Sequence, residues 1–316
     1  MFRGSWQVIL TAIRQANPSL LVLLCLLGLA WYSVDAVGYW LLYRRQGMPL
    51  GYADCFCMAF MSIFCDVTTM GAATKPLQLW YSYQKGADVG RCTSILIIPY
   101  IFQKTLITLF ALVLFAWQHE FVRTRFGDTV QYVYLGAAGS VLVSVGLAIL
   151  CTVPSVYEVL MRLIDRLLRA PRWDGLRKTA REQLGNISRA GREILTDKKL
   201  CVVLALNSTF KLLLLYSIPA VSLWAVEGGL YGASPAELFT MTAIMKLIMG
   251  VLPTSGGVGS LEVVFSLLFS KVFGEVTGGT LMVLFRVATY YLPFLVSIVL
   301  VGGVFAAYRK QGGRTS

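Results

Sequence analysis

The sequence has little charge. Only 14% of its 316 residues are Asp, Glu, Lys or Arg, and 57% are hydrophobic; about 25% charged residues are usual in a soluble domain. This composition excludes a soluble enzyme, a disordered chain and a secreted disulfide scaffold. Seven or so apolar stretches of about 20 residues would fill close to half of the chain. The composition therefore predicts an all-α polytopic membrane protein.

Histidine is almost absent, and the usual signatures of catalysis are missing. His119 is the single histidine, and the seven cysteines include no Cys-x-x-Cys, so no zinc site is expected. There is no G-x-S-x-G, and the glycine-rich stretch 253–262 lacks the spacing of a phosphate-binding loop. We therefore expect no enzyme activity, no metal and no cofactor in this chain.

Basic residues exceed acidic ones, giving a net charge of +12. Eleven of the basic residues lie in the hydrophilic segment 157–199. A segment of this kind between apolar runs indicates membrane orientation rather than nucleic-acid binding. We expect 157–199 and the C-terminus to be cytoplasmic, at a bacterial plasma membrane. Apolar residues at helical spacing within 157–199 predict two helices on the inner leaflet; the alternative is a solvated linker.

Seven long apolar segments are the candidate transmembrane helices. They are 18–42, 52–72, 94–118, 131–156, 200–226, 236–252 and 280–308. Two shorter apolar pieces, 76–83 and 261–273, do not reach across a bilayer. Each follows a cluster of small or helix-breaking residues, namely Gly71 in the first case and Pro253, Gly256, Gly257 and Gly259 in the second. These patterns predict two re-entrant helices.

The two halves of the chain resemble each other. Gly71 precedes Lys104 by 33 residues, and Gly257 precedes Arg286 by 29 residues, with a short apolar piece between them in each case. Paired interrupted segments indicate a transporter's midplane site. We expect a first transmembrane half at 1–156, the basic segment at 157–199 and a second half at 200–316. The sequence leaves open whether the repeat is inverted or parallel, and whether the likeness is chance.

Several ionisable residues lie inside apolar segments, where each costs at least about 2.5–3.5 kcal/mol. The strongest candidates for binding a lipid phosphate are Lys104, Lys246 and Arg286, with Lys75 as a further one. Glu262 would hold an arginine, contact a cationic headgroup or cap a helix. The structural alternative is that Glu262 only caps and Arg286 only pairs with it.

Three further ionisable residues are expected to lie near an interface, with their charged ends reaching water. They are Asp35, Asp66 and Lys211.

The residues 253–262 read PTSGGVGSLE and are followed by an arginine in a long apolar helix. This pattern resembles the lysylphosphatidylglycerol synthase transmembrane-region family, whose motif is roughly Pro-x-x-Gly-Gly-x-Gly-x-x-Glu. In the first half, Gln103 and Lys104 stand where the family has a Glu-Arg pair, so that half is a divergent match. The resemblance covers roughly residues 18–308 and includes the position of the basic loop.

The resemblance implies the flippase-like domain of the multiple peptide resistance factor, without the soluble lysyltransferase domain of the fused relatives. The leading hypothesis is a flippase that moves an aminoacyl-phosphatidylglycerol-like phospholipid, or a lipid-linked glycan, between leaflets. The alternatives are the membrane subunit of a split aminoacyl-phosphatidylglycerol synthase and a membrane scaffold that does not transport. The partners expected are membrane phospholipid, a soluble aminoacyltransferase and a second copy in a homodimer.

Overall fold

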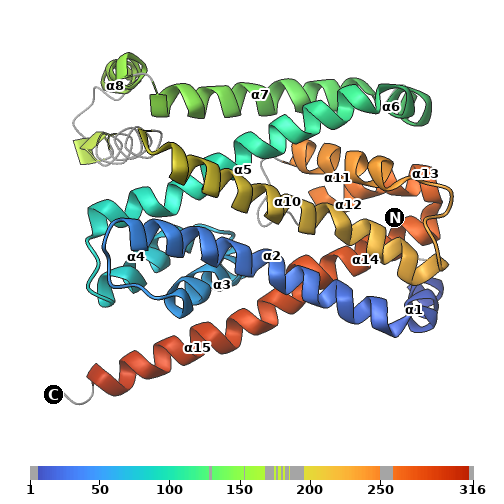
Figure 1. Cartoon of the computed structure of the whole chain (residues 1–316), viewed down its shortest axis with the longest axis horizontal. Helices are drawn as coiled ribbons and strands as arrows, with labels where there is room; N and C mark the ends of the chain where they lie inside the picture. Colours follow the sequence, from blue (N-terminus) through green and yellow to red (C-terminus); the bar gives the residue numbers. More distant parts are fainter. Residues whose placement is uncertain are drawn as a thin grey trace.

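The computed structural model describes residues 6–127, 130–152, 154–167, 174, 175, 177, 178, 181, 185, 196–249 and 259–312, and every regular element in these ranges is helical (Figure 1). The first half contains α1 (Trp6–Gln15), α2 (Pro18–Arg45), α3 (Tyr52–Thr68), α4 (Thr74–Gln84), α5 (Val89–Trp117), α6 (His119–Phe126), α7 (Val130–Thr152) and α8 (Pro154–Leu167). The second half contains α10 (Lys198–Glu227), α11 (Pro235–Met249), α12 (Ser260–Phe265), the π-helical turn η3 (Ser266–Ser270), α13 (Lys271–Phe273), α14 (Glu275–Arg286), the π-helical turn η4 (Val287–Tyr291) and α15 (Leu292–Gly312).

Polar side chains fix where the long helices start. The side chain of Asn17 accepts a hydrogen bond from the Ser19 N–H at the start of α2, and Pro18 occupies the first helical position. Asp88 and Asp197 accept in the same way at the starts of α5 and α10. Each cap satisfies a main-chain N–H that the helix itself leaves unpaired.

Helices α2 and α10 form an antiparallel central pair. The Asn17 N–H donates to the Ala225 carbonyl at 2.9 Å, which joins the start of α2 to the end of α10. At the other end, Arg45 forms an ion pair with Asp197 at 2.7 Å. Between these ends, Asn207 donates to the Val34 carbonyl at 3.1 Å. The two helices are therefore in register over nearly their whole length.

Around this pair, a long helix of each half packs against a helix of the other half. Helix α15, from the second half, packs on α3, and α5, from the first half, packs on α11. One hydrophobic cluster, which includes Tyr43, Tyr81 and Leu204, fills the end near α4. Another, which includes Phe126, Leu223 and Phe269, fills the end near α6 and α13. The polar site described below lies between these two apolar ends.

Four helices in the described ranges are long and apolar enough to cross a membrane: α2, α5, α10 and the helix from Glu275 to Arg309. The sequence predicted seven spans. One of the predicted segments is shorter in the structure, because α3 ends at Thr68 after 17 residues. Helix α11 is described over Pro235–Met249, and the last residues of its predicted segment, 250–252, lie outside the described residues. A helix needs about 20 residues to cross the hydrocarbon core.

The two short helices lie where the sequence predicted them. Residues 76–83 belong to α4, and residues 261–273 belong to the run from α12 to α13. Gly71 lies in the turn before α4 with φ +80°, a conformation that favours glycine. Gly259 has φ +86° immediately before α12. Pro253, Gly256 and Gly257 lie outside the described residues.

The first amphipathic helix predicted in the basic segment is α8, which follows α7 at the end of the molecule that also holds α4 (Figure 1). Most of the second one, predicted within 176–194, lies outside the described residues.

Candidate site at the crossing of the central helices

Charged side chains from several helices meet beside Trp31, near the middle of α2. The Lys211 ammonium on α10 lies 2.6 Å from the Asp35 carboxylate on α2. It also donates to Oε1 of Gln103 on α5 at 2.9 Å. The Lys211 side chain is 5% exposed, so this ion pair belongs to the interior. The sequence predicted both charged residues near an interface with their charged ends reaching water; the Lys211 ammonium instead pairs with Asp35 inside the protein, and its distance from an interface stays a prediction.

The ammonium groups of two lysines make cation–π contacts with the Trp31 ring. The Nζ atom of Lys211 is 4.6 Å from the ring centroid, and the Nζ atom of Lys246 on α11 is 5.7 Å from it. The Lys246 ammonium is also 5.8 Å from the centroid of Phe285, the residue before Arg286. Contacts of this kind stabilise a cation through the negative face of the ring.

Among the described residues, Lys246 has no anionic partner. Within the described ranges its ammonium makes ring contacts but no hydrogen bond and no ion pair. The Trp31 indole N–H is buried and also has no hydrogen-bond partner there. Lys211 and Arg286 are close enough to repel Lys246 electrostatically. Buried polar donors without partners are rare in native proteins, so this place suits an acceptor that the chain does not supply.

Glu262 connects the start of α12 to Arg286. Its Oε2 atom accepts a hydrogen bond from the Gly259 N–H at 2.6 Å, which caps the helix. Its Oε1 atom accepts from Arg286 Nη2 at 2.7 Å and from Nε at 3.1 Å. The Arg286 guanidinium also lies 5.1 Å from the centroid of the Tyr290 ring in η4. Glu262 therefore caps the helix and positions the arginine at the same time.

The turn at Gly71 supplies a second group of polar side chains. Thr74 Oγ1 donates to Asp66 Oδ1 at 3.5 Å. Lys75 Nζ donates to the Leu96 carbonyl of α5 at 3.0 Å, and both Asp35 and Asp66 act on it electrostatically. The charged side chains beside Trp31 therefore have the turn before α4 on one side and the start of α12 on the other.

Tyr32 ties the central helix to the turn after Arg286. Its hydroxyl donates to the Thr289 carbonyl in η4 at 3.2 Å. Gly28, one turn earlier on α2, lies so close to η4 that a Cβ atom there would be 1.9 Å from the Ala288 oxygen. Helix α2 therefore fixes the position of the turn that follows Arg286.

A sequence model of the family described as "Lysylphosphatidylglycerol synthase TM region" matches residues 1–297 of this chain. The chain belongs to this family. No curated protein and no solved structure matches it. Membership agrees with the apolar helices, and it places the chain among membrane proteins connected with lipid.

In this member of the lysylphosphatidylglycerol synthase transmembrane-region family, the structure brings together three of the predicted residues, Lys246, Glu262 and Arg286. Lys75 lies on the side of the Gly71 turn, within electrostatic reach of Asp35. Lys104 is half-buried on α5, and it is its neighbour Gln103 that contacts Lys211. The predicted role of Lys104 in the site stays a prediction.

Sequence reasoning missed Trp31, and it did not connect Asp35 with Lys211. A signal for the pair was available, since each charge is the single one in the middle of a long apolar segment and their signs are opposite. An aromatic residue in an apolar helix gives no comparable signal.

Proposed function

We propose that this chain moves a phospholipid between leaflets by passing the headgroup through the polar site while the acyl tails remain in the bilayer. The observation that carries the proposal is the partly buried Lys246 ammonium, which has no anionic partner among the described residues, beside the Trp31 indole N–H, which has no hydrogen-bond partner there either. A phosphate would satisfy both donors. An ionisable group at membrane depth is costly and usually marks a transport pathway.

Each part of the site has a role in this proposal. Lys246 binds the phosphate, and Arg286, held by Glu262, contributes further donors from the next helix. Lys211 balances Asp35 and leaves little net charge on its side of Trp31. Lys75 and Lys104 act along the path on the side of the Gly71 turn. The chain carries no lysyl-transfer chemistry in this proposal, and a soluble aminoacyltransferase would make its substrate.

The arrangement of the halves supports alternating access. If α2–α5 corresponds to α10–α15, the first helices of the two halves run antiparallel, because Asn17 meets Ala225 and Arg45 meets Asp197. The repeat is then inverted, as in many transporters whose site lies at the repeat interface. The shorter α3 and α11, each followed by a short re-entrant helix, complete a seven-span plan in which the site lies at the midplane.

The distribution of basic residues supports one orientation of the protein in the membrane. The end of the molecule near α4 and α8 carries Arg44 and Arg45 of α2, Lys198 and Lys199 of α10 and Arg309 of α15. The opposite end, near α1 and α6, carries fewer basic residues. By the positive-inside rule the first end is cytoplasmic and the N-terminal helix is external, at a bacterial plasma membrane.

The decisive experiment is a leaflet-scrambling assay in proteoliposomes with fluorescent phosphatidylglycerol and lysyl-phosphatidylglycerol. We expect the native chain to move at least one of these lipids, and Lys246→Gln to abolish the movement. Lys199→Gln is the matched control, because Lys199 is exposed at the start of α10. Movement by Lys246→Gln at the native rate would reject the site. No movement by the native chain of these or other phospholipids would reject the function.

A further inference from the structure

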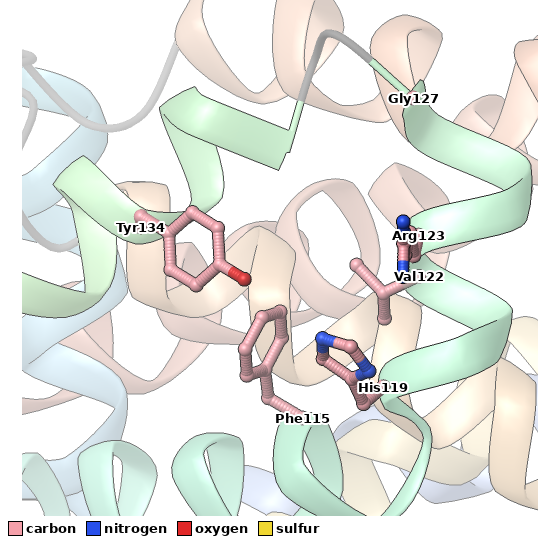
Figure 2. A pocket seen from close by; sticks show the side chains of 6 residues that line it. All are labelled: Phe115, His119, Val122, Arg123, Gly127 and Tyr134. Atoms are coloured by element: carbon pink, nitrogen blue, oxygen red, sulfur yellow. The ribbon is translucent and has the colours of Figure 1, made fainter.

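A cavity lies away from the polar site beside Trp31. It has a volume of about 500 Å³ and lies between the end of α5, the helix α6 and the first turns of α7. Its lining residues are Phe115, His119, Val122, Arg123, Gly127 and Tyr134. Figure 2 shows the Tyr134 hydroxyl pointing toward the space, with Phe115 below it and His119 and Val122 on the opposite wall. Ligand pockets in proteins commonly have about 300–1,000 Å³.

The polar side chains of this cavity suit an anion. His119 and Arg123 are four residues apart on α6 and so share one face of the helix. Arg123 offers guanidinium donors, and His119 and Tyr134 each offer a further donor. Phe115 packs edge-to-face on both, with ring centroids 6.3 Å from His119 and 5.4 Å from Tyr134. No acidic side chain is among the lining residues that the structure describes.

The surroundings of the cavity indicate a lipid. Helix α5 is long and apolar enough to cross a membrane and ends at Trp117, which is 72% exposed. Exposed tryptophans at helix ends lie at the level of the headgroups. Leu135, next to Tyr134 on α7, is 71% exposed, and Val113 on α5 is 58% exposed. These apolar surfaces would contact acyl chains beside a headgroup bound in the cavity.

We propose that this cavity binds the phosphate of an anionic phospholipid in the leaflet at the α6 end of the molecule. Arg123 and His119 contact the phosphate, Tyr134 donates to one of its oxygens, and the acyl chains lie along α5 and α7. The site is separate from the cluster at Trp31, and it exists whether or not the chain transports lipid. It adjoins the second short helix, because Lys271 of α13 donates to the Phe126 carbonyl of α6 at 3.1 Å.

The test uses the full chain in vesicles that contain a headgroup-photoreactive phosphatidylglycerol, with labelled peptides mapped by mass spectrometry. We expect labelling within 115–134, reduced about fivefold by the double variant His119→Ala, Arg123→Ala. Arg125→Ala is the control, since Arg125 is also an exposed arginine of α6 but does not line the cavity. Tyr134→Phe, which removes one hydroxyl, should give a smaller decrease.

Three results would overturn the proposal. They are undiminished labelling of the double variant, equal labelling by a phosphatidylcholine probe, and loss of labelling in excess inorganic phosphate, which would show a site for a soluble anion. Lys246→Gln should leave the labelling within 115–134 unchanged. Labelling at the cavity can therefore be confirmed or rejected independently of the proposed transport.

Discussion

Glu262 holds Arg286 through one carboxylate oxygen, at 2.7 Å, and caps the start of α12 through the other. The arginine side chain is 8% exposed and the glutamate side chain is 33% exposed. The two residues are 24 positions apart and come from different helices. The contact therefore ties the short helix α12 to the long helix that carries Arg286.

Removing the acid should destabilise the protein and stop transport. In Glu262→Ala, Arg286 keeps its charge but loses the carboxylate, and the free energy of unfolding should fall by about 3 kcal/mol. Replacing both residues with methionine should restore much of this stability, because no buried charge is left unpaired. Denaturation followed by tryptophan fluorescence, beside the scrambling assay, checks both effects. Transport by the double variant would show that the pair is structural only.

The cation at Lys246 should be required for transport but not for stability. Lys246→Met removes a partly buried charge that has no anionic partner in the described part of the chain. Removing such a charge relieves a desolvation cost. We expect the thermal midpoint to stay unchanged or to rise, while transport of anionic lipid is lost. A fall in the midpoint with transport intact would contradict the assigned role.

The Asp35–Lys211 pair should behave in the opposite way. Lys211→Met leaves the Asp35 carboxylate without its partner 2.6 Å away, and we expect a loss of about 3 kcal/mol in the free energy of unfolding. Adding Asp35→Asn should recover part of that loss, since the uncompensated charge is then gone. A double-mutant cycle measures the coupling directly. Additive effects of the two changes would show that the ion pair contributes nothing.

The close contact at Gly28 gives a steric prediction. A methyl group at this position would lie 1.9 Å from the Ala288 oxygen and 2.7 Å from its carbonyl carbon, so Gly28→Ala must push α2 away from η4. We expect a loss of about 1–3 kcal/mol in stability. Gly303→Ala in α15 is the matched control, because no atom lies within 4 Å of its Cβ position. The control should gain up to about 1 kcal/mol from helix propensity.

The proposed orientation can be checked by labelling single cysteines in a version of the chain without its seven native cysteines. Arg91→Cys, at the start of α5, should be protected in intact cells from a reagent that cannot cross membranes. Arg125→Cys, on α6 at the other end of α5, should be labelled. The reverse pattern would invert the topology and leave the antiparallel pairing of α2 and α10 intact.

Sequence periodicity and composition predicted helices at all of the long apolar segments, because a helix in a bilayer must satisfy its own main-chain hydrogen bonds. The contact of Glu262 with Arg286 was also predictable from the sequence. An acid at the third position of a helix caps it, and an arginine deep in the next helix needs a partner. These inferences rest on rules that act over short stretches of chain.

The pairing of distant helices was not predictable in the same way. Asp35 and Lys211 are 176 positions apart, and nothing in their spacing shows that α2 and α10 lie side by side. The shortness of α3 was also missed, because hydropathy runs smoothly into the turn that follows it. Trp31 reads as one more apolar residue until two lysines are seen over its ring.

The π-helical turn at 287–291 follows Arg286 directly. Such a turn amounts to one extra residue inserted in an α-helix, and each residue of an α-helix turns the chain by about 100°. Deleting one residue from 287–291 would let the turn relax into a continuous α-helix. If α15 kept its packing on α3, Arg286 would swing about 100° around the helix axis, away from Glu262. The insertion therefore sets the direction in which the arginine points, and a shorter chain with the same amino acids would aim it elsewhere.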